Sequence, residues 1–270
     1  MTLIVGILCT DGVVVASDSA ATFGAAGIPT IGQQEVTKIH RLSDSVLFSS
    51  TGAVGMAQVI ANEIRNSWQS REFRERQQPE QAMNYIGNKI AQVVGPYLQT
   101  GNLSRPLVGD CSMSLCKSLV AMPVNHSPCL FNFDFNGAPE QATNDLPFIS
   151  LGSGQRIADP FLAFLKRLLW LDTSPSLAEG RLAAVWTIDH VRLTNPGGVG
   201  GKIQLATLAV EGRGRAADRQ PTVTMFSEDE LQEPLQQIRA AEDALTKELR
   251  AIRPENADAL PPPPVQNNNN

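Results

Sequence analysis

Four residues near the start of the chain have the types and the order that suit nucleophilic attack on an amide: Thr2, Asp18, Lys38 and Gly52. A threonine hydroxyl becomes a good nucleophile only when a base removes its proton. An N-terminal threonine carries such a base in its own α-amine, whose pKa of about 7.7–8.0 lies closer to neutrality than the lysine value of about 10.4. This chemistry requires that Met1 be removed, because an acylated Thr2 nitrogen cannot act as a base.

The other three residues could assist such a nucleophile. A cationic Lys38 would disfavour protonation of the α-amine and stabilise the developing alkoxide. The carboxylate of Asp18 would keep that lysine charged and in place, although the two could also form a purely structural ion pair. A backbone N–H at Gly52 would donate to the oxyanion of the tetrahedral intermediate. Thr2 alone would indicate nothing, because many proteins begin with Met-Thr.

Short apolar segments predict the strands that would position these residues. Two of them are joined by Asp11-Gly12, a dipeptide that favours the positive φ angles of a tight β-hairpin turn. The strands predicted before the first helix are Leu3–Cys9, Val13–Ser19, Val36–His40 and Val46–Ser50. Thr2 would then lie at the tip of a strand. Ala20–Gly32 is rich in Ala, Gly and Thr, and we expect a flexible loop there.

The rest of the chain alternates between helical and strand patterns. Apolar residues at helical spacing predict helices at Met56–Trp68, Met83–Leu98, Ile157–Leu168 and Ser176–Val191. Strands are predicted at Leu119–Val124, Leu130–Phe135, Phe148–Leu151 and Ile203–Val210. The order is strands, two helices, strands, two helices, strands. Two packed sheets with a pair of helices on each outer face satisfy this order, which makes the predicted fold class α+β.

The C-terminal part differs in character from what precedes it. Glu228–Ile252 has a charged amphipathic helical pattern, with leucine and isoleucine on one side. Pro261–Pro264 and Asn267–Asn270 are low-complexity runs typical of disorder. We therefore predict a domain at residues 1–226, a helical extension at 227–253 and a disordered tail at 254–270. The extension is most simply a packing or subunit-contact element.

The composition argues against several classes of protein. A net charge of −5 lacks the basic field of an electrostatic nucleic-acid binder. No run approaches the roughly 18 apolar residues of a membrane span, and no basic region precedes the first apolar run as it would in a signal peptide. Cys9, Cys111, Cys116 and Cys129 lack CxxC spacing, which favours reduced core thiols in a cytoplasmic protein over a metal site.

We expect neither a cofactor nor a metal ion. The glycine-rich stretches Gly52–Gly55 and Gly197–Gly201 fit neither GxGxxG nor the P-loop pattern GxxxxGK followed by Ser or Thr. The three histidines, His40, His126 and His190, share no metal-ligand spacing. His40 lies two residues after Lys38 on the same face of the predicted strand. It either lines a substrate pocket or is simply a half-exposed sheet residue.

The N-terminal segment resembles the β-type peptidases of the proteasome, which belong to the N-terminal nucleophile hydrolases and include the bacterial HslV peptidase. The resemblance is dense over residues 2–60, in the stretches TLIVGILCTDGVVVASDSAAT, VTKIHRLSD and STGAVGMAQ. It resumes at Leu151–Gly154 and, more loosely, at Gly200–Leu205. HslV-type chains are shorter, so the length and the long C-terminal helix suit a divergent bacterial proteasome homologue better.

This resemblance implies a four-layer αββα sandwich and a threonine endopeptidase. Thr2 would be the nucleophile and its α-amine the base, with Asp18 and Lys38 as the charged pair and Gly52 as the oxyanion donor. Ser153, in the Gly-Ser-Gly turn, would support the amine, although a serine there could also cap the following helix. The family further implies a homo-oligomeric ring around an internal chamber, unfolded protein or peptide substrates, and an ATPase unfoldase as partner.

One part of the family pattern is missing, and two rival functions stand beside the peptidase. The family often has an Asp and a Ser before the last glycine pair, where this chain reads Thr194-Asn195-Pro196-Gly197-Gly198-Val199. Asp189 and Asn195 are the candidates to replace them. One alternative is therefore a catalytically silent ring subunit, which is disfavoured because the N-terminal helical extension of α-type subunits is not seen. The other is a non-peptidase amidase of the same superfamily that acts on a small molecule.

Overall fold

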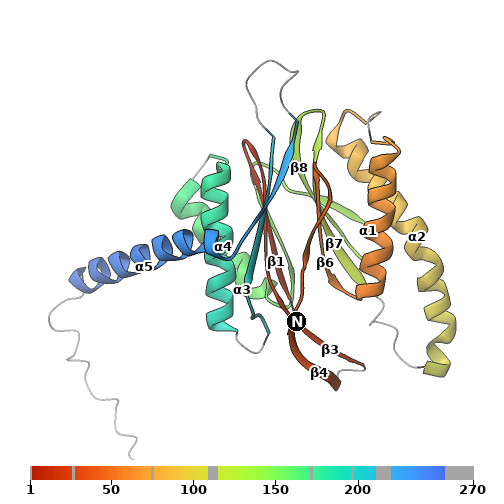
Figure 1. Cartoon of the computed structure of the whole chain (residues 1–270), viewed down its shortest axis with the longest axis horizontal. Coiled ribbons are helices and arrows are strands. Elements are labelled where there is room, and N and C mark those ends of the chain that lie inside the picture. The colour runs from red at the N-terminus through yellow and green to blue at the C-terminus, as the bar shows by residue number, and fades with distance from the viewer. Residues whose placement is uncertain are drawn as a thin grey trace, which may run out of the picture.

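Two antiparallel five-stranded sheets, packed face to face between helices, form the body of the molecule (Figure 1). The structure, a computed structural model, describes residues 2–25, 28–73, 76–108, 115–170, 173–195, 198–210 and 220–252. The first sheet has the spatial order β10 (Phe148–Gly152), β1 (Leu3–Cys9), β2 (Gly12–Asp18), β11 (Ile203–Ala209) and β12 (Thr222–Phe226). The second has the order β5 (Ile39–Ser43), β6 (Val46–Gly52), β7 (Cys116–Val124), β8 (Ser127–Phe133) and β9 (Pro139–Gln141).

The Asp11–Gly12 turn joins β1 and β2 in the predicted hairpin. The register runs from Cys9 opposite Gly12 to Ile4 opposite Ser17, which brings the start of β1 and the end of β2 to the same edge of the sheet. Both strands are central, because β10 flanks β1 on its other side and β11 flanks β2. Their residues are therefore almost entirely buried, and the two strand ends are held firmly in place.

Two helical elements cover the outer face of the first sheet: α3 (Gln155–Leu165), which continues as a π-helical turn at Lys166–Trp170, and α4 (Leu177–Thr194). Fully buried side chains of these helices, such as Leu162 and Ile188, share one core with Val5 and Val14 of the sheet. Ser176 caps α4, because its hydroxyl accepts from the Glu179 N–H while the Glu179 carboxylate accepts from the Ser176 N–H. The predicted pair of helices is confirmed.

The helices α1 (Val54–Gln69) and α2 (Pro79–Val108) cover the outer face of the second sheet, as Figure 1 shows. The predicted apolar stripe of α1 is confirmed, since Met56, Ile60 and Ile64 are buried. They pack with Phe48 and Phe131 of the sheet in a second core. A third core, which includes Ile4, Val13 and Leu119, lies between the two sheets. These three cores separate four layers, so the predicted αββα sandwich is confirmed.

The predicted flexible loop at Ala20–Gly32 is wrong. The backbone there forms a hairpin of β3 (Ala20–Ala25) and β4 (Ile28–Glu35), with Ala20 opposite Glu35 and Ala21 opposite Gln34. The loop was predicted from the abundance of Ala, Gly and Thr. These residues keep both a backbone N–H and a backbone C=O group, which can pair between strands. The hairpin lies near the N-terminus, outside the two large sheets (Figure 1).

Several predicted strand boundaries differ from the structure, and the structure gives the reason for two of them. The strand expected at Val36–His40 begins only at Ile39, because a side chain of β11 binds the backbone before it. The strand expected to reach Phe135 ends at Phe133, where a turn begins with hydrogen bonds of the Asp134 backbone to Gly137 and Ala138.

The C-terminal helical segment is a 3-10 turn at Asp229–Leu231 followed by α5 (Gln232–Ile252). Leu231 and Ile238 are 2% and 1% exposed and belong to the core of the first sheet. The far half of α5 extends away from α4 (Figure 1), and Leu245 and Leu249 there are exposed. The division at 226/227 stays a prediction, and the predicted disordered tail at 254–270 lies outside the described residues.

Three of the cysteines are unpaired and buried: Cys9, Cys116 and Cys129. Burial raises the pKa of Cys9 well above its usual range and raises the pKa of Cys116 and of Cys129 to about 11. The prediction of unpaired core thiols is confirmed for these three, whereas Cys111 lies outside the described residues. Within the described ranges, no helix has the length and apolar character needed to cross a lipid bilayer.

Candidate active site

Thr2 lies at the end of β1, beside the turn that follows β10. Its neighbour Leu3 pairs with Gly152, which has a φ of 101°. A Cβ atom on Gly152 would collide with the Thr2 carbonyl oxygen. Glycine has no Cβ and adopts positive φ readily, so it allows this turn to approach Thr2 closely.

Ser153 is the residue of that turn that contacts Thr2. The Thr2 backbone nitrogen donates to Ser153 Oγ at 3.2 Å, and Ser153 Oγ lies 3.4 Å from the Thr2 carbonyl oxygen. The N–H of Gly154 also donates to that carbonyl, at 3.3 Å. Gly154, not Ser153, is the N-cap residue of α3, and the cap has no side-chain hydrogen bond. The structure therefore places Ser153 against the Thr2 nitrogen rather than in the alternative capping role.

The Asp18 side chain is fully buried and binds the start of β1 and the segments next to it. Its Oδ1 accepts from the Leu3 N–H at 2.8 Å and from Lys38 Nζ at 2.7 Å. Its Oδ2 accepts from the Gly200 N–H at 3.2 Å. Because one carboxylate oxygen binds both the residue after Thr2 and the lysine, Asp18 fixes the ammonium group next to Thr2.

Lys38 is 7% exposed and precedes β5. Its Nζ donates to Asp18 and, at 2.6 Å, to the carbonyl oxygen of Ala20. Burial lowers the pKa of Lys38, while the charge and hydrogen bond of Asp18 oppose that shift. The carboxylate thus favours the ammonium form in an environment that would otherwise favour the neutral amine.

Gln204 is a positioning residue that sequence reasoning missed. Its Oε1 accepts from the Lys38 N–H at 2.8 Å, and its Nε2 donates to the Val36 carbonyl at 2.6 Å. The Gln204 side-chain amide thereby makes the hydrogen bonds that a neighbouring strand would otherwise make to the backbone of the segment that carries Lys38. Gln204 lies on β11. In the sequence it is one residue of the loosely matching stretch Gly200–Leu205, and that stretch alone indicates no role for it.

Gly52 ends β6 with a φ of 110°. A Cβ there would collide with the carbonyl oxygen of Leu115, which already accepts from the Ala53 N–H at 2.9 Å. The position therefore strongly favours glycine, both for its φ and for the space. Gly52 and Thr2 line the same cavity, so the structure brings this predicted residue to the site as well.

The residues considered as replacements for the missing family pair are not brought to Thr2. Asp189 forms an ion pair with Arg192 of its own helix, at 3.7 Å. Asn195 is the C-cap of α4, and its carbonyl accepts from the N–H groups of Gly198 and Val199. This segment contacts the site through its backbone instead, by the hydrogen bond from Gly200 to Asp18.

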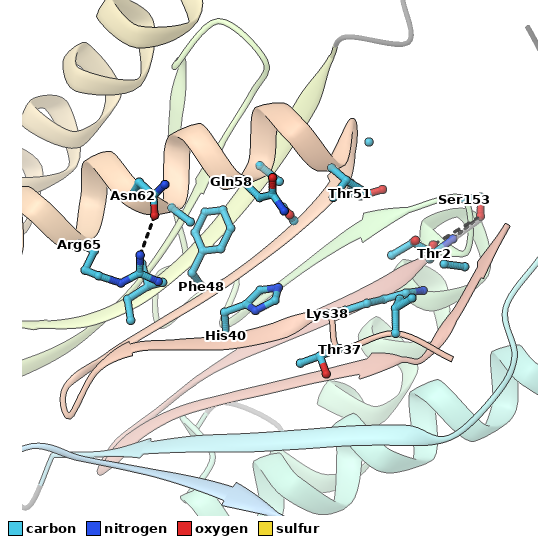
Figure 2. A pocket seen from close by; sticks show the side chains of 18 residues that line it. Thr2, Thr37, Lys38, His40, Phe48, Thr51, Gln58, Asn62, Arg65 and Ser153 are labelled. Carbon is cyan, nitrogen blue, oxygen red and sulfur yellow. Dashed lines mark hydrogen bonds between the residues drawn. The ribbon is translucent and has the colours of Figure 1, made fainter. Parts of the chain in front are cut away.

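A cavity of about 910 Å³ opens in front of Thr2 and runs between α1 and the strands β5 and β6. Figure 2 shows Thr2, Lys38 and Ser153 at one end, His40 and Phe48 in the middle, and Asn62 and Arg65 at the other end. His40 and Phe48 face each other on paired strands, with ring centroids 6.4 Å apart. His40 lines this cavity and is at the same time an exposed residue of β5, so both interpretations of His40 describe it.

Electrostatics favour a neutral His40 and set two cationic side chains in the cavity wall, of which Lys38 is paired with Asp18. Burial lowers the pKa of His40, and the positive charge of Arg65 lowers it further. Lys38 and Arg65 both line the cavity, and among the described lining residues there is no aspartate or glutamate. Within the described ranges, no group of His, Cys, Asp and Glu side chains could hold a metal ion. The site therefore brings together a hydroxyl, a backbone nitrogen and an ammonium group beside a cavity of substrate size.

Comparison with known proteins places these observations in a family. The model of the family described as "Proteasome subunit" matches residues 2–167. Among curated relatives, the proteasome subunit beta of Archaeoglobus profundus is 26% identical over 157 residues, and that of Methanococcoides burtonii is 29% identical over 157 residues. These matches cover 58% of this chain but only 63% and 65% of the two relatives, which is less than two thirds of their length.

Solved structures share the fold over nearly the whole chain. Anbu (ancestral beta-subunit) from Yersinia bercovieri has a TM-score of 0.65 at 17% identity, covering 94% of this chain and 98% of that one. The Anbu complex from Pseudomonas aeruginosa, which forms a helical assembly, has a TM-score of 0.64 at 19% identity and covers 98% and 100%. At these identities the likeness establishes the fold alone.

Proposed function

The chain belongs to the proteasome subunit family, and on that premise we propose that it is a threonine endopeptidase that cleaves peptide bonds through an acyl-enzyme on Thr2, once Met1 has been removed. The observation that carries the proposal is the double contact of Asp18, whose Oδ1 binds both the Leu3 N–H and the Lys38 ammonium. This contact sets a buried positive charge beside the residue that would be both nucleophile and base.

The first half of the reaction forms the acyl-enzyme. The α-amine of Thr2 takes the hydroxyl proton, and Oγ1 forms a bond with the substrate carbonyl carbon. The Gly52 N–H donates to the resulting oxyanion, and the Lys38 charge stabilises negative charge on Oγ1 as the proton leaves. The protonated amine then gives its proton to the leaving nitrogen, the C–N bond breaks, and an ester on Thr2 remains.

The second half of the reaction releases the acid product. The free α-amine takes a proton from water, whose oxygen attacks the ester carbonyl. The C–Oγ1 bond breaks, and Oγ1 recovers a proton from the amine. Ser153, 3.2 Å from the Thr2 nitrogen, orients the amine in both halves. Lys38, whose ammonium form is favoured by the ion pair with Asp18, disfavours a second positive charge on that amine, which keeps the amine available as a base.

Three threonine variants, one of them a matched control, test this mechanism. Wild type, Thr2→Ala, Thr2→Ser and Thr10→Ala should be assayed against fluorogenic peptides. Thr10 lies at the other end of β1 and is exposed, so Thr10→Ala makes the same chemical change away from the site. Ala and Ser are both small enough to permit Met1 removal. We expect no turnover in Thr2→Ala, reduced turnover in Thr2→Ser and wild-type turnover in Thr10→Ala. Equal turnover in wild type and Thr2→Ala would refute the nucleophile.

The same experiment distinguishes the rival functions. A catalytically silent subunit would give no turnover in any variant. Activity on small amides without activity on unfolded protein would identify a non-peptidase amidase of the same superfamily. Degradation of a permanently unfolded protein, such as reduced casein, that disappears in Thr2→Ala would support the endopeptidase.

We also propose a cytoplasmic homo-oligomer that encloses these active sites and receives unfolded protein or peptides, with an ATPase unfoldase as partner. The support is family membership and the likeness to the Anbu complex, whose Pseudomonas aeruginosa form assembles helically. The sequence resemblance implies a closed ring, whereas a helical assembly is open. An open helical assembly is therefore the alternative to the ring. Native mass spectrometry with electron microscopy would test this, and a monomer at micromolar concentration would contradict it.

A further inference from the structure

A second cavity, of about 660 Å³, lies at the far end of α1 from Thr2. Trp68, in the last turn of α1, lines it, and at about 1.5 Å per residue Trp68 lies roughly 21 Å along the helix axis from Val54, which lines the first cavity. The β7–β8 turn at Asn125 and His126 lines the second cavity as well. Among the described residues, the two cavities share no lining residue. The volume is that of a small-molecule site.

The most buried residues that line the second cavity are apolar. Phe73 and Met122 are 8% and 1% exposed, and Val124 is buried as well. The half-buried indole ring of Trp68 lies beside Phe73, with the two ring centroids 5.8 Å apart. Aromatic side chains offer a large apolar area and pack well against other rings. The inner wall of this cavity therefore suits a flat apolar group.

Two arginines line the same cavity. Arg71 is exposed, and the Arg76 guanidinium carbon lies 3.7 Å from the centroid of the Tyr85 ring. Arg76 also donates to the backbone carbonyl of Glu72, so its guanidinium is held in place. Within the described part of the chain, neither arginine forms an ion pair, and no aspartate or glutamate lines the cavity. The Glu72 carboxylate is paired with Lys89 at 3.3 Å instead. Both arginines can therefore bind an anion.

The backbone around this cavity adopts conformations that usually favour glycine. Arg71, Asn125 and His126 have φ angles of 61°, 48° and 62°, and in the described part of the chain they are the non-glycine residues with positive φ. Arg71 follows the C-cap of α1, and the other two form a two-residue hairpin turn, where glycine is common. Each of the three positions has instead a polar side chain that lines the cavity. These side chains are present there at a cost in backbone free energy.

We propose that this second cavity binds a small molecule in which a flat apolar ring carries an anionic group, either a carboxylate or a phosphate ester. The ring packs on Trp68 and Phe73. The anion accepts hydrogen bonds from Arg71 and Arg76, because the N–H groups of a guanidinium match the oxygens of either group in pairs. None of the described residues that line this cavity belongs to the proposed active site, so the assignment does not depend on the peptidase function.

Neither half of such a ligand binds well alone. Arginines near the surface hold a free anion weakly, because water solvates both charges and salt screens them. An uncharged ring gains only the burial of its apolar surface. A ring that carries the anion excludes water from the cavity, which strengthens the hydrogen bonds to the guanidinium groups. Binding therefore requires the ring and the anion in one molecule.

Isothermal titration calorimetry of the whole protein tests this site with four probes: 1-naphthylacetate, its uncharged amide 1-naphthylacetamide, 1-naphthyl phosphate and acetate. The variants are Arg71→Met, Arg65→Met and Arg239→Met. Arg65 lines the first cavity, and Arg239 is exposed on α5 and lines neither, so these two changes each remove one positive charge elsewhere. The methyl resonance of Met122, assigned with Met122→Leu, reports binding in the second cavity. The resonance of Met56, which is buried under α1 and lines neither cavity, is the control.

We expect 1-naphthylacetate to bind wild type with a Kd of about 1 mM or tighter, and the amide and acetate to bind at least about tenfold more weakly. Arg71→Met should weaken the binding of 1-naphthylacetate about tenfold, whereas Arg65→Met and Arg239→Met should leave its Kd unchanged. The Met122 resonance should shift on addition of 1-naphthylacetate, and the Met56 resonance should not. Equal Kd values for the acid and the amide, an unshifted Met122 resonance, or a loss of affinity in Arg65→Met but not in Arg71→Met would overturn the proposal.

The two wild-type measurements, with the acid and with the amide, decide the question even if a variant fails to fold. The phosphate probe distinguishes the two sources of the anion. Tighter binding of 1-naphthyl phosphate than of 1-naphthylacetate would support the proposal with a phosphate ester as the natural ligand. The reverse order would support it with a carboxylic acid.

Discussion

Replacing Asp18 by asparagine is the perturbation that most sharply tests the arrangement at the start of β1. The carboxylate accepts three described hydrogen bonds, from Leu3 N, Lys38 Nζ and Gly200 N, and both oxygens take part. An asparagine has one acceptor oxygen, and its NH₂ group would face at least one of these donors. Asp18→Asn would therefore leave the Lys38 ammonium without its counter-charge in a buried site, or set two donors against each other.

The expected cost follows from the burial of the pair. The side chains of Asp18 and Lys38 are 0% and 6% exposed and 2.7 Å apart. Removing one partner of a buried ion pair typically costs about 3–5 kcal/mol, because the other charge stays desolvated. Removing both charges, in Asp18→Asn with Lys38→Met, should cost less than the sum of the two single changes. Asp44→Asn breaks an exposed ion pair and should cost less than about 1 kcal/mol.

Urea unfolding followed by circular dichroism, at one fixed protein concentration, measures these differences. We expect the unfolding midpoint of Asp18→Asn to fall far below that of wild type, with Asp44→Asn close to wild type. A loss of less than about 1 kcal/mol in Asp18→Asn would refute the reasoning, since it would mean that the carboxylate does not hold a buried charge. Additive costs in the double variant would refute the direct coupling of the two residues.

Three further changes have expected outcomes that stability or pH measurements can check. Gly52→Ala should destabilise by more than 1 kcal/mol because its Cβ collides with a backbone carbonyl, whereas Gly55→Ala, in open space on a helix, should be neutral or stabilising by up to about 1 kcal/mol. His40 has a lowered pKa, so the unfolded chain binds its proton first as the pH falls below about 6.5, and the unfolding free energy should fall from there down to the folded pKa. His40→Gln should flatten that dependence. Ile238→Ala should cost about 2–4 kcal/mol, whereas the exposed Leu245→Ala should cost under about 0.5.

Each of these expectations has a contradicting result. Equal changes in the free energy of unfolding in Gly52→Ala and Gly55→Ala would show that the positive φ and the nearby carbonyl do not restrict position 52. Parallel pH dependence in wild type and His40→Gln would assign the loss of stability to other groups. An Ile238→Ala cost as small as that of Leu245→Ala would show that the first half of α5 is not part of the core.

Local patterns predicted most of the architecture. The β1–β2 hairpin followed from Asp11-Gly12, and the α1 stripe followed from residues four positions apart, because turn chemistry and helical period are properties of short segments. The proposed site also followed in part. Thr2, Asp18, Lys38 and Gly52 were predicted from residue type and order and Ser153 from the family resemblance, and the structure gathers them at one end of a single cavity or directly beside it.

The remaining features depend on contacts between distant segments, which a local pattern does not contain. The β3–β4 hairpin is held by backbone pairing between residues that looked like a loop. Gln204 reaches Lys38 across 166 positions of sequence, and an isolated glutamine has no signal for that contact. In the sequence, Arg65 is one of several charged residues on a helix, and only the fold brings it to the same cavity as His40.

The central claim, that Thr2 is a free N-terminal nucleophile, is tested most directly by the intact mass of the purified protein before and after treatment with an electrophile directed at N-terminal threonine. We predict a mass without Met1 and a single adduct per chain, located at Thr2 by fragmentation and absent from Thr2→Ala. A chain that retains Met1, or an adduct that persists in Thr2→Ala, would contradict the account.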